Sequence, residues 1–232
     1  MNRLCFVLAL LIAVSVPAAA QIEIGPRVSN YSTDLQVPPL DLHTGRVSSF
    51  GIVGGYRTGS FVLDWMYDHD TQNGINITDI IVDVGDYQRD RGEVTVGFRI
   101  LPVLDLQGGV RIDQVRIGGV SFLGNPVATD LDIDHQALVA GVRFHSASQG
   151  PAGFYVVGRA IVGEAQFRNG IGPDDEDVGT VGYRAEAGIP IRLGESNWTI
   201  VPGAEYDHLR ADDNGFRMNS NRLFLSLVYS AK

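Results

Sequence analysis

Acid and imidazole groups occur together at two places in the sequence. The segment 64–70 carries three aspartates and His69, and further along the chain Asp207 directly precedes His208. A carboxylate beside an imidazole can act as a general acid and base on a hydrolysable substrate. Adjacent residues of a strand face opposite sides of a sheet, however, so Asp207 and His208 could not act on one substrate. We therefore expect no catalytic residues here.

Two other groups of polar residues suggest chemistry only at first sight. His145 and Ser146 are neighbours, as in a hydrolase dyad, but they fall in an expected short turn. Asp130, Asp132 and Asp134 have the spacing of a calcium loop, but Gly141 stands where that loop needs a bidentate glutamate. The sequence contains no glycine-rich phosphate loop and no HExxH helix, so we expect neither a cofactor nor a metal site.

The charge balance narrows the possible partners. The formal net charge is −9 and the sequence pI is about 4.9, which argues against a nucleic-acid partner because phosphates need a basic surface. Lys232 is the only lysine, so nearly every positive side chain is an arginine. Arginine presents a planar fork of donors that matches a carboxylate, which suits it to buried ion pairs.

The segments that must position these side chains show apolar and polar residues alternating with a two-residue period. In the segment 93–100, valine, phenylalanine and isoleucine residues alternate with Glu93, Thr95, Gly97 and Arg99. Similar alternation recurs in about ten segments, an even number of the kind that bacterial single-chain barrels use. No convincing helical period follows the N-terminal region. The sequence predicts an all-β chain, with eight strands as the alternative to about ten.

The polar sides of these segments carry nearly equal numbers of arginines and carboxylates. An unpaired buried charge is costly, so a narrow barrel lumen lined by both should be crossed by ion pairs. A small selective pore lined by the same residues is the alternative. The predicted lumen network comprises Arg27, Arg99, Arg111, Arg143, Arg159, Arg184, Arg222, Glu23, Asp64, Glu93, Asp105, Glu186, Glu205 and Asp207, with Arg192 and Asp113 also placed on the inward side.

Aromatic residues and connection lengths favour a membrane barrel over a soluble sandwich. Aromatic side chains recur on the apolar faces at the short-turn ends of the strands, as in the girdle of a membrane interface. This predicted girdle contains Tyr56, Phe61, Phe144, Phe154, Trp198 and Tyr229. Short connections are expected near 57–60, 101–103, 145–153 and 193–196, and long ones near 31–46, 68–92, 115–134, 166–180 and 210–220.

The N-terminus has the features of a secretory leader. A basic residue, an apolar run and Ala18-Ala19-Ala20 precede Gln21, so residues 1–20 are predicted to be a cleaved signal peptide. The remaining 21–232 form one predicted barrel domain. The only cysteine, Cys5, lies within the leader, so the mature chain should contain neither a disulfide nor a thiolate site.

The chain resembles the small outer-membrane β-barrel proteins, a group that includes OmpA-like transmembrane domains and OmpW-like barrels. The resemblance rests on the alternation and on a last strand with Leu223, Leu225, Leu227 and Tyr229, although Ser230, Ala231 and Lys232 follow that aromatic residue. It implies a single antiparallel up-and-down barrel in a bacterial outer membrane, with short periplasmic turns and long extracellular loops. It also implies lipid, lipopolysaccharide and the barrel assembly machinery as partners, and a monomer.

The resemblance leaves the activity open. A structural role, or limited passage of ions and small solutes, is the first expectation. A surface receptor or adhesin acting through its long loops is the alternative. A rim hydrolase is the third, because the segment 64–68 is weakly similar to omptin proteases. The acidic residues of the predicted loops, Asp174, Asp175, Glu176 and Asp177 among them, could also bridge divalent cations to lipopolysaccharide.

Overall fold

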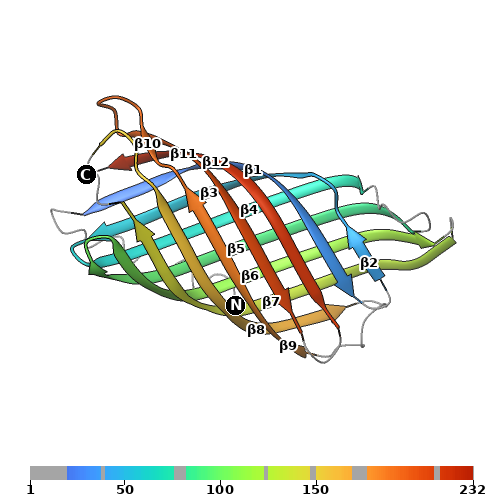
Figure 1. Ribbon diagram of the computed structural model, residues 1–232. Helices are drawn as coiled ribbons and strands as arrows, with labels where there is room; N and C mark the ends of the chain where they lie inside the picture. The colour runs from blue at the N-terminus through green and yellow to red at the C-terminus, as the bar shows by residue number, and fades with distance from the viewer. Residues whose placement is uncertain are drawn as a thin grey trace.

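The computed structural model describes residues 20–37, 40–75, 82–122, 125–146, 150–168, 177–211 and 215–231. Apart from Ala20, the predicted leader lies outside the described residues, as do Asp174, Asp175 and Glu176. No helix in these ranges is long and apolar enough to cross a membrane. The strands are β1 (Gln21–Val37), β2 (Leu40–His43), β3 (Val47–Thr58), β4 (Phe61–Ile75), β5 (Val82–Leu101), β6 (Leu104–Phe122), β7 (Asn125–His145), β8 (Tyr155–Arg168), β9 (Asp177–Gly188), β10 (Ile191–Arg192), β11 (Trp198–Arg210) and β12 (Arg217–Ala231) (Figure 1).

The strands close into an antiparallel barrel, which confirms the predicted fold class. The wall runs β1, β3, β4, β5, β6, β7, β8, β9, β11, β12 and returns to β1. Closure occurs between the first and last strands, where Ile22 is paired with Ala231 and Gln36 with Arg217. The short strands β2 and β10 only extend the edges of this wall, beside β1 and β11 respectively.

Along long strands such as β6, the apolar residues change from the outward to the inward side of the wall. On β6, Val110 points outward and is 50% exposed, whereas Val115 points inward and is 3% exposed. The outward positions beyond Ile112 are the polar residues Gln114 and Arg116. The wall therefore has an apolar outer surface near the short turns and a polar outer surface farther away. We call the first zone the apolar belt and the second the wall extension.

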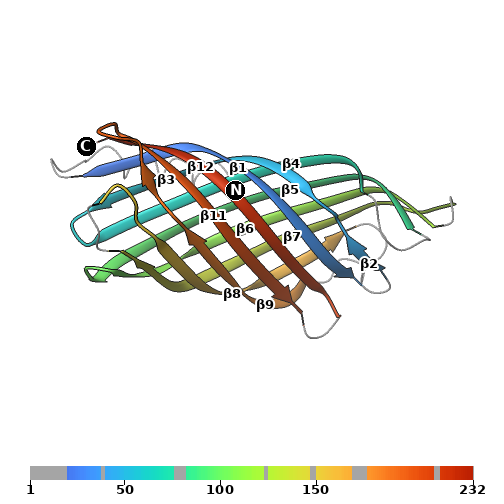
Figure 2. The same cartoon turned by 45° about the horizontal axis from the view of Figure 1, so that its top comes forward.

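The wall extension contains residues that the sequence assigned to connections. Both the end of β6 at Phe122 and the start of β7 at Asn125 lie within the predicted 115–134 connection, and β4 and β5 occupy most of 68–92. The strands β6 and β7 reach farthest from the turn end in Figures 1 and 2. The physical reason is that a strand surrounded by water keeps its apolar side inward, so the outward apolar rows that marked the strands end before the strands do.

Aromatic side chains cluster at the short-turn end of the belt, where Figure 1 also places the C-terminus. The rings of Trp198 and Tyr229 lie 5.1 Å apart, and those of Phe144 and Phe154 lie 5.9 Å apart. Phe61 contacts Tyr56, its ring centroid 6.3 Å from that of the tyrosine. All six residues of the predicted girdle therefore contact one another in pairs at this end.

Candidate functional site in the barrel interior

The interior of the barrel has three levels, which differ in chemistry. A cavity of about 460 Å³ at the turn end, which we call the vestibule, is lined in part by Arg57, Asp64, Tyr155 and Glu186. Above it lies a layer of buried arginines and carboxylates, which we call the charged layer. It contains Arg27, Arg89, Arg91, Arg111, Arg159, Arg184, Arg222, Asp68, Glu93, Asp113, Glu186, Glu205 and Asp207.

The third level fills the barrel at the end remote from the turns. Its side chains are apolar, apart from two tyrosine hydroxyls, and they are almost wholly buried inside the wall extension and the strands that adjoin it. We call this cluster the apolar plug. It contains Tyr31, Leu35, Val37, Leu42, Val47, Tyr87, Val115, Ile117, Leu131, Ile133, Ala137, Val139, Ile161, Ala165, Phe167, Val178, Leu209, Ala211, Phe216 and Met218.

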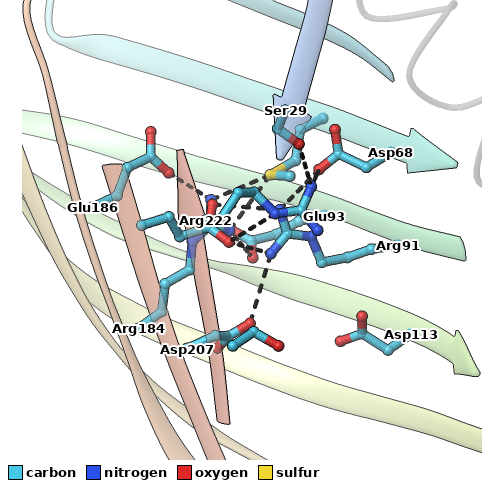
Figure 3. Close-up of polar contacts among 12 residues, drawn as sticks. Ser29, Asp68, Arg91, Glu93, Asp113, Arg184, Glu186, Asp207 and Arg222 are labelled. Carbon is cyan, nitrogen blue, oxygen red and sulfur yellow. Dashed lines mark hydrogen bonds and ion pairs between the residues drawn. The ribbon is translucent and has the colours of Figure 1, made fainter. Parts of the chain in front are cut away.

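Arg222 lies near the centre of the charged layer (Figure 3). Its Nη1 donates to Asp68 at 2.9 Å and to the hydroxyls of Ser29 and Ser49 at 3.0 and 3.2 Å. These partners come from β4, β1 and β3, whereas Arg222 is on β12. One guanidinium thus joins four strands around the closure of the barrel.

Glu205 and Arg184 join the other strands of the layer. Glu205 accepts hydrogen bonds from Arg27 at 3.2 Å, from Arg184 at 2.6 Å and from Arg91. Arg184 also pairs with Glu93 at 2.8 Å and with Glu186 at 2.5 Å. Each charge therefore contacts several opposite charges, which is what burial of charges requires.

Arg111 completes the layer on the side of β6. Its two terminal nitrogens donate to the two carboxylate oxygens of Asp207, and its Nε donates to Asp113 at 2.6 Å. Asp113 also accepts from Arg89 at 3.0 Å. Such bidentate pairs are stronger and more directional than single contacts.

The remaining predicted residues pair at the turn end of the interior. Arg143 lies 3.1 Å from Asp64, Arg99 lies 3.2 Å from Asp105, and Glu23 pairs with Arg57. Every one of the fourteen residues predicted for the lumen network thus makes at least one ion pair. Arg192 does not join them, because it is exposed on β10 at the rim.

Arg57, Arg89, Arg91 and Asp68 belong to the same ion-pair system but were missing from the predicted network. Arg89 and Arg91 fall in the predicted 68–92 connection. They are nevertheless alternate residues of β5 with Glu93, so all three side chains point to the same side of the strand. Continuing the alternation of the segment 93–100 backward would have found both. Asp68, one of the candidate hydrolase acids of the segment 64–70, pairs with Arg91 at 2.8 Å.

The structure does not assemble the candidate hydrolase groups. His69 and His208 point out of the barrel, where His69 contacts Asp90 at 2.7 Å and His208 contacts Asn219 at 2.5 Å. The inward carboxylates Asp68 and Asp207 are held by arginines. No described histidine therefore lies beside these two acids inside the lumen.

Two further acids in the wall extension are also occupied. Burial raises the pKa of the Asp70 carboxyl, to which the Tyr31 hydroxyl donates a hydrogen bond. Burial likewise acts to raise the pKa of Asp90, but hydrogen bonds with His69 and Tyr67 outweigh it and hold that pKa below its usual value. Both carboxyls are therefore already hydrogen-bonded to neighbouring side chains of the wall.

The other candidate motifs also lack the geometry that their chemistry needs. The Nδ1 atom of His145 lies 3.4 Å from the backbone oxygen of Ser146, while the Ser146 hydroxyl accepts from the Phe154 amide at 3.1 Å. The imidazole therefore does not activate that hydroxyl. Among the residues that the structure describes, no group of three or more histidine, cysteine, aspartate or glutamate residues could hold a metal ion. The side chain of Asp130 is outside the described part.

Comparison with known proteins identifies the fold. No protein-family description matches the chain. No curated protein sequence matches it. Among solved structures, the outer membrane protease OmpT from Escherichia coli is similar with a TM-score of 0.53 and 7% identity, over 93% of this chain and 98% of that chain. The translocator domain of the autotransporter NalP from Neisseria meningitidis has a TM-score of 0.52 and 11% identity, over 97% of this chain and 93% of that one. The chain therefore has the fold of bacterial outer-membrane barrels.

Proposed function

We propose that this protein is a sealed outer-membrane barrel, which anchors a rigid wall extension at the cell surface. The observation that carries the proposal is the apolar plug stacked on the charged layer. Leu131, Ala165 and Leu209, from three different strands of the wall, are each 0% exposed within the plug. A pore would need a continuous polar, hydrated path, and tightly packed apolar side chains leave none.

The apolar belt supports the membrane placement. Large apolar side chains such as Phe50, Leu138 and Leu223 are more than 60% exposed on its outer surface. A soluble protein rarely exposes a continuous apolar surface of this extent, whereas a bilayer would cover it. On this proposal residues 1–20 are the export leader, lipid and lipopolysaccharide surround a monomer, and the barrel assembly machinery inserts it.

The polar wall extension supports the surface role. Outward residues beyond the belt, among them Asp34, Arg116 and Asp132, are polar and suited to water. Cross-strand ion pairs, such as that of Arg168 with Asp134 at 3.0 Å, lie on this outer surface. A wall held by its own apolar core is a stiffer platform for a surface partner than loops alone, because packed interiors resist deformation.

Planar-bilayer recording of the purified full chain tests the seal. We expect no stepwise conductance from the wild-type protein. A variant that combines Leu131→Gly, Phe167→Gly and Leu209→Gly removes three plug side chains and should admit water above the charged layer. Frequent, stable channels from the wild-type protein would overturn the proposal.

Cysteine labelling tests the same proposal without an electrical readout. The chain has a single cysteine, Cys5, so a Cys5→Ser background is free of thiols. In that background a membrane-impermeant maleimide should label Gln136→Cys on the outer wall and Thr199→Cys in the vestibule. It should leave Ala165→Cys in the plug unlabelled from both sides. Labelling of all three positions at similar rates would contradict the seal.

A further inference from the structure

A side lobe of the vestibule is lined by more arginines than carboxylates. This lobe has a volume of about 220 Å³ and opens at the turn end. Its charged lining is Arg57, Arg99, Arg143, Arg192, His145 and Asp105. The charged layer has nearly as many carboxylates as arginines, but here four arginines face one carboxylate. Excess positive charge in a concave site favours the binding of an anionic ligand.

Carboxylates satisfy these donors only in part. Arg57 pairs with Glu23 and with Asp64 at 3.3 Å, from outside the lobe. Asp105 is buried at the back of the lobe, where Arg99 contacts it only through Nε, at 3.2 Å. The other two guanidinium nitrogens of Arg99 make no hydrogen bond or ion pair with the residues that the structure describes. Arg143 donates only Nη1, to Asp64 at 3.1 Å. Several charged donors thus remain available in one small space.

The arrangement of these donors is fixed before any ligand binds. Arg99, Asp105 and Arg143 are direct partners in register on the neighbouring strands β5, β6 and β7. The guanidinium of Arg143 also stacks on the Tyr155 ring, 4.8 Å from its centroid. Side chains held on strands in this way lose little entropy when they bind.

The rim of the lobe is tied down as well. The amide of Gly153 donates to the Pro190 oxygen at 2.9 Å, and the amide of Arg192 donates to the Pro151 oxygen at 2.8 Å. These bonds join two turns that are distant in sequence and hold β10 at the mouth. The Arg192 side chain, which forms no hydrogen bond or ion pair with another described residue, is thereby placed at the entrance.

The partial burial of the donors favours strong binding. The side chains of Arg57, Arg143 and His145 are about one fifth exposed, at 20%, 19% and 21%. They are reachable from the mouth but are poorly hydrated. Ion pairs in such a site are screened less than those on an open surface.

We propose that this lobe binds the oxyanion group of a small molecule or chain end, either a carboxylate or a phosphate, that enters from the turn end. The planar forks of Arg99 and Arg143 would hold two of its oxygens, and Arg192 would contact it at the mouth. The adjoining vestibule leaves room for the rest of the molecule. Which compartment the mouth faces depends on the proposed membrane placement, but binding itself does not.

Isothermal titration of the full chain in detergent with inorganic phosphate and, separately, with acetate tests the proposal at constant ionic strength. We expect saturable binding of at least one anion at one site per chain. Binding of phosphate alone would identify the oxyanion as a phosphate group, and binding of acetate alone would identify it as a carboxylate. Failure of both anions to saturate a site would overturn the proposal.

Variants locate the site. Arg99→Gln, and separately Arg192→Gln, should each weaken binding about tenfold, because each loses charge-assisted hydrogen bonds. Arg192 is exposed at the rim, so its variant should fold even if Arg99→Gln does not. Arg116→Gln is the matched control, since this arginine lies on the outer wall with a 59% exposed side chain. Equal weakening by Arg116→Gln and Arg192→Gln, or no weakening by the lobe variants, would contradict the assignment.

Discussion

Arg111 and Asp207 form a two-pronged ion pair across the barrel interior, from β6 to β11. One pair of atoms lies 2.9 Å apart, Nη1 to Oδ1, and the other, Nη2 to Oδ2, lies 2.5 Å apart. The two strands are not neighbours in the wall, so the pair braces it from within. Because both groups are almost fully buried, each stabilises the fold only while the other is present.

Replacing Arg111 should therefore be strongly destabilising. Arg111→Met would remove both hydrogen bonds to Asp207, leaving only the more distant Arg91 and Arg89, at 3.6 and 3.9 Å. We expect a loss of roughly 3–5 kcal/mol in the free energy of unfolding. Urea titration of the refolded barrel, followed by its heat-modifiable mobility on gels, measures this loss.

The control for this prediction is another arginine of the same strand. Arg116→Met removes an exposed pair with Asp132, whose atoms lie 3.8 Å apart, and should cost about 1 kcal/mol or less. The double variant Arg111→Met, Asp207→Leu should regain part of the loss, because no carboxylate is then left unpaired. Similar stability of both single variants would show that the interior ion pair stabilises the fold no more than the exposed one.

The apolar plug should behave like the core of a soluble protein. Phe167 is 1% exposed and packs edge to face on Phe216, with 5.3 Å between the ring centroids. Phe167→Ala should lower the free energy of unfolding by about 3–5 kcal/mol, because it leaves a cavity. Phe50→Ala, at a 64% exposed position of the belt, is the size-matched control and should cost much less in detergent. Equal losses would mean that the plug is not packed.

The barrel and the belt could be predicted from the sequence because the outward apolar rows are directly visible as a two-residue alternation. Positions such as Val94, Val96 and Phe98 alternate with polar residues, and only a strand with one apolar face gives that pattern. The same rows predicted which side chains point inward. The inward position of the ion-paired residues Arg27, Arg184 and Glu205 could therefore be predicted from the alternation alone.

The strands of the wall extension could not be predicted from the sequence in the same way. Beyond the belt the apolar residues move to the inward side, as Val115 and Ile117 do, so the row that marked the strand ends. The plug was missed with it. Pairings across the lumen, such as Arg222 with Asp68, depend on the length of the side chains and on the stagger of the strands. The alternation of inward and outward residues specifies neither.

Close contact between neighbouring strands at Gly109 gives a further prediction. A Cβ atom at this residue would lie 2.0 Å from the backbone oxygen of Val94 on β5. Gly109→Ala should therefore shift the wall and cost roughly 1–3 kcal/mol. At Gly92, also in the wall, an added Cβ would meet nothing within 4 Å, so Gly92→Ala should change stability by about 0.5 kcal/mol or less. Unfolding titrations of the two variants compare these costs, and a larger loss at Gly92 would contradict the expected contact.

The boundary of the belt can be tested on the last strand alone. Leu225 points outward with 47% exposure and lies between Val28 and Pro202 of the neighbouring strands. Asn221 points outward on the same strand, beyond the belt. If a bilayer covers the belt, Leu225→Arg should reduce the free energy of folding into lipid vesicles by about 2–4 kcal/mol, and Asn221→Arg by about 1 kcal/mol or less.

The same pair of variants separates membrane burial from a general effect of arginine. In detergent micelles, which adapt to the surface they cover, the difference between the two variants should shrink. In vesicles it should return, because the hydrocarbon layer has a fixed thickness and a charge near its middle cannot reach water. Equal costs at the two positions in vesicles would place the bilayer elsewhere on the barrel, and a larger cost at Asn221 would move the belt into the wall extension.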